Sequence, residues 1–277
     1  MAKKWKVGLA LWLGLVGWVF SAAHATQTTP RKIVSINVCT DQLAMMLVGK
    51  DQWLSVSRLA LDPELSVLAA EAENYPINNT DAEEIFLMKP DLVLAGTYNS
   101  RATVAMLRKL GLRVEEFEPT LSFDDIAEQM LRIGALIGRE EEARRQIAQM
   151  KADLAAIKRP EQRKTLALYY ANSYTAGRGT LIDDAVRLAG FDNLTDRIGV
   201  EGAARLPMEL LVMEKPDVLV LSKRQWTPAL AEENLAHPAI HRMVSDARLI
   251  ELDDKLTVCG GPFSVEAVAR LAEAGRD

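Results

Sequence analysis

The sequence lacks the short motifs that mark many enzyme classes. It has no G-x-S-x-G nucleophile elbow, no P-loop, no H-E-x-x-H zinc motif and no dinucleotide-binding fingerprint. The segment "AGRGTLID", which starts at Ala176, has too few glycines to replace that fingerprint. Asp183 and Asp184 are adjacent, so on a helix they point to different faces and make a poor hydrolytic pair. We therefore expect a binding protein without catalytic chemistry, and we keep an exported hydrolase as the weakest alternative.

Cysteines and runs of basic residues are also scarce. The two cysteines, Cys39 and Cys259, lie near opposite ends of the chain, and in an oxidising compartment they are expected to pair. Lys and Arg total 33 against 38 acidic residues, and they form no long run. A protein that binds the nucleic-acid backbone needs a concentrated basic surface. The composition therefore argues against a nucleic-acid partner.

The first 25 residues differ in composition from the rest. Three lysines precede an apolar run from Val7 to Phe20, and the segment ends with Ala-His-Ala at residues 23–25. This order is typical of a secretory signal peptide. The run is shorter than the roughly 20 residues that cross a bilayer, so we expect cleavage after Ala25 and a soluble periplasmic protein. Cleavage would leave 30 bases against 38 acids, a net charge of −8, with no cysteine directly after the site for lipid attachment.

Short apolar runs alternate with helical periodicity along the rest of the chain. Helical patterns start at Asp124 and at Gly179. Because strands and helices alternate in both halves, we predict an α/β fold of two similar lobes with mainly parallel sheets. The runs that we assign to buried strands are 31–36, 90–95, 165–171, 216–222 and 247–252.

One segment occurs twice, once in each half. "EEIFLMKPDLVLAG" starts at Glu83 and "ELLVMEKPDVLVLS" starts at Glu209, and alignment of Asp91 with Asp217 places the two glutamates opposite each other. In each copy a short amphipathic helix must end where the proline stands, and an apolar strand follows. We interpret the pair as a helix-to-strand module used once per lobe. The alternative is that such a module recurs by chance in an α/β protein.

A charged, amphipathic segment separates the two halves. Its apolar residues form one stripe, and charges fill the other faces. A helix over 139–158 would be about 30 Å long at about 1.5 Å per residue, which is enough to span two lobes. We therefore predict an N-terminal lobe at 26–137, a linking helix at 138–160 and a C-terminal lobe at 161–277. A single rigid helix between the lobes predicts limited closure.

Several segments carry, in their order and spacing, the pattern of a known family. They are "IVSINVCTDQLAMML", "AEEIFLMKPDLVLAG", the linking helix, "YTAGRGTLIDDAVRLAGFDNL", "LPMELLVMEKPDVLVLS" and "HPAIHRMVSDARLIELDD". In this order they resemble the periplasmic substrate-binding proteins of ATP-driven (ABC) importers that have one long helical backbone. Those proteins are receptors for ferric siderophores, haem, cobalamin and some bare metals. The resemblance covers nearly all of the chain after the signal peptide. It implies a monomer without a cofactor that delivers a metal chelate to a permease dimer.

The resemblance gives the duplicated glutamates a role. In that family one surface carboxylate on each lobe pairs with arginines of the two permease subunits, and motif position assigns this role to Glu83 and Glu209. Two separated salt bridges are weak individually, but they set orientation and speed the encounter. The alternative is that both are solvated residues near a helix N-terminus, where an acidic side chain suits the helix dipole.

The resemblance also implies a ligand cleft between the lobes, where loops at the C-terminal ends of the parallel strands converge. Aromatic side chains there would cover a large flat chelate, and arginines would pair with its carboxylates or catecholates. The loops are 37–40, 57–59, 96–101, 170–178, 222–226 and 259–263. The predicted ligand-binding residues are Asn37, Cys39, Arg58, Tyr98, Arg101, Tyr170, Tyr174, Arg178, Arg224, Trp226, Cys259 and Phe263.

Four arginines in this set favour an anionic ferric siderophore as the ligand, with cobalamin as the alternative. A bare transition metal is disfavoured, because such receptors use three or four fixed donors that usually include histidine. Only His237 and His241 would remain after processing, and Pro238 predicts a structural turn at a helix start. Haem ligation by one of the three tyrosines of the set is a lower alternative.

In the family pattern both cysteines fall on cleft-facing loops of opposite lobes. Joined, Cys39 and Cys259 would hold the cleft nearly shut. Unjoined, they would be two thiols beside a ligand, sensitive to oxidation or to metals. A bridge requires Cα atoms within about 7 Å. A pair of cysteines on these loops is a departure of this sequence from the family it resembles, and both alternatives, joined and unjoined, stay open at this point.

Overall fold

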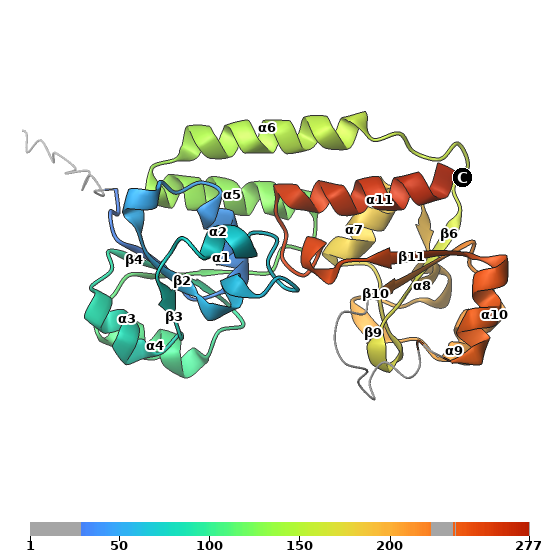
Figure 1. The fold of residues 1–277 in the computed structure, drawn as a ribbon, viewed down its shortest axis with the longest axis horizontal. Coiled ribbons are helices and arrows are strands. Elements are labelled where there is room, and N and C mark those ends of the chain that lie inside the picture. The colour runs from blue at the N-terminus through green and yellow to red at the C-terminus, as the bar shows by residue number, and fades with distance from the viewer. Residues whose placement is uncertain (1–28, 223–234, 236, 277) are drawn as a thin grey trace, which may run out of the picture.

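Two α/β lobes lie side by side in the computed structural model, which describes residues 29–222, 235 and 237–276 (Figure 1). Three helices run along one edge. Of these, α5 (Phe123–Ile137) lies beside the first lobe, α11 (Val265–Arg276) lies beside the second, and α6 (Glu140–Ala156) extends across both. The expected α/β fold with mainly parallel sheets is confirmed. The predicted signal peptide, residues 1–25, lies outside the described residues. Within the described residues no helix is long and apolar enough to cross a bilayer.

The first lobe is built on a five-stranded sheet in the order β3-β2-β1-β4-β5, in which every pair is parallel. In such sheets the carboxyl ends of all strands meet at one edge, where α/β proteins bind ligands. The strands are β1 (Ile33–Ser35), β2 (Trp53–Ser57), β3 (Ile77–Asn78), β4 (Leu92–Gly96) and β5 (Val114–Phe117). The helices between them are α1 (Val38–Met45), α2 (Ala69–Ala72), α3 (Ala82–Met88) and α4 (Arg101–Lys109).

The second lobe has a four-stranded parallel sheet in the order β11-β10-β6-β8 and a small antiparallel pair, β7 with β9. Its strands are β6 (Thr165–Tyr169), β7 (Tyr174–Ala176), β8 (Asp192–Asn193), β9 (Ala203–Arg205), β10 (Val218–Ser222) and β11 (Arg248–Leu252). Its helices, besides α11, are α7 (Leu181–Leu188), α8 (Leu194–Ile198), α9 (Met208–Glu214) and α10 (Pro238–Asp246).

The five strands predicted from apolar runs are present as β1, β4, β6, β10 and β11. The prediction omits β2, β3, β5, β7, β8 and β9. Polar residues interrupt β2 and β5. Ser55 and Ser57 are buried within β2, and the two central residues of β5 are half-buried glutamates. Burial of these polar residues depends on contacts that a local pattern does not contain.

The repeated segment forms the same module in both lobes. Each short helix, α3 and α9, ends at a lysine in the left-handed conformation, with φ of 52° at Lys89 and 45° at Lys215. The Asp91 carboxylate then accepts hydrogen bonds of 2.9 and 3.1 Å from the two amides at residues 31 and 32, just before β1. Asp217 accepts one of 2.7 Å from the first amide of β6. Each aspartate therefore fastens the start of the neighbouring central strand.

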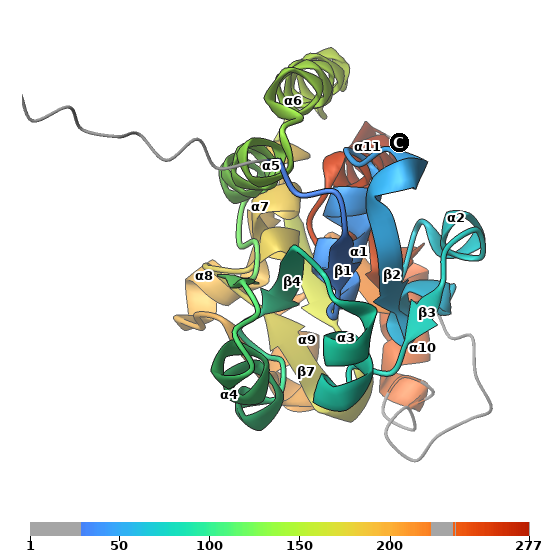
Figure 2. The same ribbon diagram turned by 90° about the vertical axis from the view of Figure 1, so that its left-hand side faces the viewer.

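The linking helix is observed as α6 over Glu140–Ala156, close to the predicted 139–158. Ile147 and Met150 on its apolar stripe are buried, and α6 packs along α5 (Figure 2). The Gln146 side-chain amide also donates a 2.7 Å hydrogen bond to the carbonyl of Met46 at the end of α1. The helix is thus held against the first lobe by both apolar and polar contacts.

Candidate functional site

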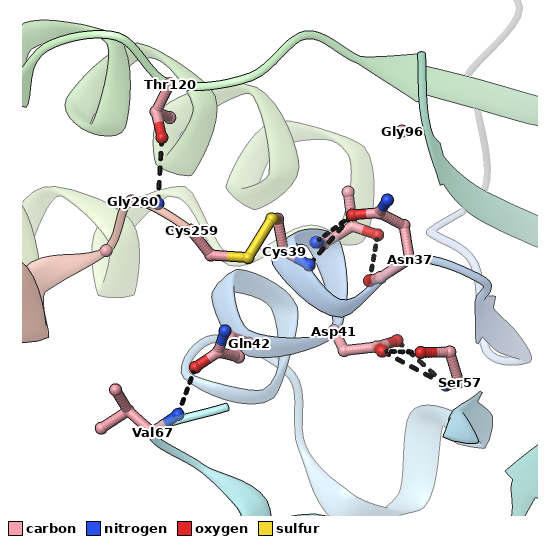
Figure 3. The surroundings of a disulfide bond; sticks show 12 residues. Asn37, Cys39, Asp41, Gln42, Ser57, Val67, Gly96, Thr120, Cys259 and Gly260 are labelled. Carbon is pink, nitrogen blue, oxygen red and sulfur yellow. Dashed lines mark hydrogen bonds between the residues drawn. A yellow bond between two sulfur atoms is a disulfide. The ribbon is translucent and has the colours of Figure 1, made fainter. Parts of the chain in front are cut away.

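A disulfide joins the two lobes at the ends of their parallel strands. Cys39 lies at the start of α1 and Cys259 lies between β11 and α11, 220 positions further along the sequence (Figure 3). Their Cα atoms are 5.0 Å apart, within the roughly 7 Å that a bridge allows. Both cysteines therefore form a cross-link, and the alternative of two free thiols beside a ligand is wrong.

The cysteine of the first lobe is positioned by the cap of α1. Asn37 is the N-cap residue, and its side-chain oxygen accepts hydrogen bonds from the amides of Cys39 (2.9 Å) and Thr40 (3.4 Å). Gly96, at the end of β4, leaves room for this cap, because a Cβ atom there would lie 2.6 Å from the Asn37 side-chain nitrogen. Asn37, predicted to contact ligand, thus has a structural role that its position in the loop after β1 explains.

A buried carboxylate supports the same turn. Asp41 accepts a 2.5 Å hydrogen bond from the Ser57 hydroxyl and a 3.2 Å bond from the Ser57 amide, which ties α1 to the end of β2 (Figure 3). Its side chain is fully buried, and this burial raises the pKa of Asp41 to about 6. Sequence reasoning missed this residue, although a single acid within the mostly apolar stretch "CTDQLAMML" is a signal that could have found it.

Hydrogen bonds beside the disulfide extend the seam between the lobes. The amide of Gly260 donates to the hydroxyl of Thr120 at 3.0 Å, and the Lys255 ammonium donates to the carbonyl of Pro63 at 3.1 Å. A Cβ atom at Gly260 would lie only 2.2 Å from the Thr120 hydroxyl oxygen. We call these contacts, together with the disulfide, the interlobe seam. They join the start of α1, which follows β1, and the loops after β2 and β5 to the segment after β11.

The adjacent aspartates of α7 have separate structural partners. Asp183 is buried and accepts hydrogen bonds from Arg187 (2.8 and 3.2 Å) and Asn193 (2.8 Å). Asp184 accepts a 2.8 Å bond from the amide of Phe123 at the start of α5, in the other lobe, and burial raises the pKa of Asp184. The two carboxylates point to different faces, as predicted, and each already serves to hold the fold together.

The predicted ligand residues Arg58, Tyr98 and Arg101 of the first lobe follow the carboxyl ends of β2 and β4. Arg58 is exposed, and its guanidinium donates hydrogen bonds of 3.0 and 2.5 Å to the side-chain oxygen of Asn79. Tyr98, after β4, is 86% exposed. Arg101 is the first residue of α4 and is also exposed. Asn79 is neutral, so these hydrogen bonds form no ion pair with Arg58.

The predicted residues of the second lobe are in part engaged within the protein. Tyr170, after β6, is half-buried, and desolvation together with the Asp254 carboxylate raises its pKa. Tyr174 is exposed, and the guanidinium of Arg205 lies 5.7 Å from the centre of its ring. Arg178 forms a 3.2 Å salt bridge with Asp196. Its charge is already paired, which weakens the expectation that four arginines await an anionic ligand.

The remaining predicted residues complete this survey. Phe263 is half-buried in a 3-10 turn at Pro262–Ser264. Arg224 and Trp226 lie outside the described residues. Sequence reasoning also missed three exposed apolar side chains on the loops after β2, β5 and β11, which the seam joins. They are Leu59, Leu121 and Val258.

Comparison with known proteins identifies the family. The family model described as periplasmic binding protein matches residues 33–252. The chain belongs to this family. Proteins of this family are substrate-binding components of ATP-driven (ABC) importers, and a relative from Bacillus subtilis that is 25% identical is named an ABC transporter substrate-binding lipoprotein. The resemblance stated from the motifs is therefore confirmed.

Individual relatives support the assignment. A cobalamin-binding protein of Halobacterium salinarum is 28% identical over 265 residues, which cover 92% of this chain and 72% of that protein. A possible iron-binding periplasmic solute-binding protein of Staphylococcus epidermidis has a TM-score of 0.74 at 19% identity, with 89% of this chain and 98% of that one covered. The vitamin B12-binding protein BtuF of Vibrio cholerae has a TM-score of 0.63 at 18% identity, covering 88% and 96%. At such identity the solved structures establish the fold alone.

The histidines of this periplasmic binding protein do not gather into a metal site within the described residues. His237 caps α10, because its ring nitrogen Nδ1 accepts a 3.1 Å hydrogen bond from the amide of Ala239, and the helix begins at Pro238 as predicted. The side chain of His241 lies outside the described residues. In the part of the chain that the structure describes, no three His, Cys, Asp or Glu side chains are grouped so that they could hold a metal ion.

The two duplicated glutamates occupy equivalent, exposed positions. Glu83 lies in the first turn of α3 and Glu209 lies in the first turn of α9. Both are available to a partner, and both also suit the positive end of a helix dipole. Their geometry alone is compatible with either role.

Proposed function

We propose that the mature chain is a periplasmic receptor that holds one large metal chelate between its lobes and delivers it to an ATP-driven importer. The observation that carries the proposal is the interlobe seam. Loops at the strand ends of both lobes are fastened together by the disulfide and its neighbouring hydrogen bonds. Exposed apolar side chains lie on these loops, and the exposed Tyr98 lies on the loop after β4. The lobe boundaries are proposed as 26–137 and 161–277, with the linking helix between them and signal cleavage after Ala25.

We propose a corrinoid such as cobalamin as the ligand. A corrinoid is broad and carries little net charge, so its recognition depends on apolar and aromatic contact more than on ion pairs. Tyr98, Leu59 and Val258 expose such surface on three different loops, and Arg178 of the predicted set already has an acidic partner in Asp196. The Halobacterium relative, which is named a cobalamin-binding protein, supports the same proposal.

A ferric siderophore is the second candidate. Arg58 and Arg101 are exposed on loops after β2 and β4, and guanidinium groups pair well with carboxylates and catecholates. Arg58 is held in place by neutral Asn79, so it could pair with an anionic ligand without losing a salt bridge. The two candidates therefore differ in whether apolar side chains or arginines dominate binding.

Calorimetric titration of the processed protein distinguishes them. The panel is cyanocobalamin, a ferric hydroxamate, a ferric catecholate and haemin. If the ligand is a corrinoid, Tyr98→Ala and Val258→Ser weaken cyanocobalamin binding about tenfold each, the loss expected when a large apolar contact of about 1.4 kcal/mol or more is removed, while Arg58→Gln has little effect. If the ligand is an anionic siderophore, Arg58→Gln should weaken its binding the most, and Tyr98→Ala and Val258→Ser should have little effect. Leu131→Ser, on the exposed face of α5, is the matched control. If the calorimetric titration shows no saturable binding of any of the four compounds, the proposal is overturned.

We also propose that Glu83 and Glu209 dock the loaded protein on the permease. Their equivalent positions in the two copies of the module, one per lobe, suit a partner made of two like subunits. Opposite charges across such a contact act mainly on orientation and association rate. Replacement of either glutamate by glutamine should lower the association rate and reduce its dependence on salt.

A further inference from the structure

The first lobe has an open groove beside the duplicated module. The groove lies between α3 and α4 and has a volume of about 910 Å³. Its apolar part is made of side chains that a folded protein usually buries: Leu87 is 76% exposed, Met106 is 47% exposed and Phe86 is 41% exposed. Clustered exposure of this kind marks an interaction surface more often than a chance arrangement.

The rim of the same groove is acidic. Asp81 and Glu83 are exposed at the start of α3, and Glu84 lies beside them, where it accepts a 2.8 Å hydrogen bond from the amide of Asn79. All three acids line the groove, and no Lys or Arg is among the residues that line it in the described chain. The groove therefore combines apolar contact with negative charge at one end.

The second lobe has a different surface at the equivalent place. Between α9 and α10 lies a smaller cavity of about 410 Å³, and its charged lining includes Lys215 and Arg242 as well as Asp217. The residue aligned with Leu87 is Met213, which is 75% exposed but does not line that cavity, and Glu209 does not line it either. Between these two cavities of the described residues, the one in the first lobe includes the glutamate of the module in its lining, and the one in the second lobe does not.

We propose that the groove between α3 and α4 receives a short segment of the permease in which a basic side chain stands next to apolar ones. The proposal rests on the proposed function, and it adds that docking is asymmetric, with the first lobe providing most of the affinity. Charge complementarity selects this occupant. An acidic rim repels an anionic lipid surface, and it repels a second copy of a chain whose net charge is already −5.

A pair of matched variants tests the asymmetry. Leu87→Ser and Met213→Ser remove exposed apolar side chains at aligned positions with nearly equal exposure, 76% and 75%. Binding of each variant is measured on the importer's permease–ATPase complex in lipid nanodiscs, by surface-based kinetics at low and high salt. We expect Leu87→Ser to raise the Kd about tenfold, the effect of losing a buried leucine contact, and Met213→Ser to change it less than twofold. Glu83→Gln should remove more of the salt dependence than Glu209→Gln. Unchanged unfolding midpoints for all four variants would show that the fold is intact.

The outcomes separate the inference from the function on which it rests. If the unmodified protein fails to bind the complex, both the proposed function and the groove proposal fall. If it binds and both glutamate variants weaken it, but Leu87→Ser and Met213→Ser behave alike, the importer function stands and the asymmetric groove is refuted. Sedimentation of the unmodified chain alone adds a further test. A dimer that Leu87→Ser dissociates would identify a second copy as the occupant and overturn the proposal.

Discussion

Asp41 makes a quantitative prediction about stability and pH. Its carboxyl group is fully buried, and burial raises its pKa from 3.8 to about 6 in the folded protein despite the hydrogen bonds from Ser57. The protonated form is therefore favoured by folding. Its stabilising contribution is fully present below about pH 3.8 and is lost as the pH rises through about 6. A shift of about two units at about 1.4 kcal/mol per unit corresponds to about 3 kcal/mol.

The variant Asp41→Asn removes this titration and keeps the shape of the side chain. The amide oxygen can still accept from the Ser57 amide, and the amide nitrogen can donate to the Ser57 hydroxyl. We expect the stability of the variant relative to the wild type to increase by about 3 kcal/mol between pH 3.8 and pH 7.5. Urea unfolding with the disulfide intact, measured across this range, gives both free energies.

A surface control isolates the effect of burial. Glu141 on α6 has a side chain that is 94% exposed, and its replacement by glutamine should change the free energy of unfolding by less than about 0.5 kcal/mol at any pH in the range. If the difference between Asp41→Asn and the wild type stays constant with pH, the buried carboxyl does not titrate as argued. The assignment of Asp41 as a buried carboxyl group whose pKa is raised by folding would then be refuted.

Two further predictions concern the interlobe seam. Replacement of Cys39 and Cys259 by serine should lower the free energy of unfolding by about 5 kcal/mol, because the bridge closes a loop of 220 residues. Urea unfolding under non-reducing conditions measures this loss. A loss below about 1 kcal/mol would contradict the stabilising role of the disulfide in the interlobe seam. Gly260→Ala should cost about 2 kcal/mol, because the new Cβ atom meets the Thr120 hydroxyl at 2.2 Å. A variant as stable as the wild type would mean that the seam adapts to the added methyl group without cost.

The sequence predicts those parts of the fold that depend on local patterns. The five apolar runs appear as strands, a helix over Glu140–Ala156 lies within the linking segment predicted at 138–160, and α10 begins at Pro238. Each of these features follows from periodicity or from a residue that restricts the backbone. The duplicated module was visible for the same reason, since Lys-Pro-Asp ends a helix wherever it occurs.

The site depends on contacts that local patterns do not contain. In the sequence alone Arg178 is a candidate cation for ligand binding. In the structure α8 places the Asp196 carboxylate 3.2 Å from its guanidinium group. In the sequence alone Asp41 is an ordinary helix residue. In the structure it is buried, and its carboxylate accepts a hydrogen bond from the hydroxyl of Ser57, 16 residues away. The disulfide was one of two open alternatives, because only the packed lobes bring the Cα atoms to 5.0 Å. Exposed Leu59, for its part, is indistinguishable in sequence from a core leucine.

The central claim is that one intact chelate is held between the lobes, and native mass spectrometry tests it most directly. The processed protein is incubated with an equimolar mixture of cyanocobalamin, a ferric hydroxamate, a ferric catecholate and haemin, and the mass of the complex is then measured. The account predicts a single species with one unmodified chelate bound, which Tyr98→Ala depletes and Leu131→Ser does not. A protein that stays free at all concentrations, or that releases a chemically altered chelate, would contradict it.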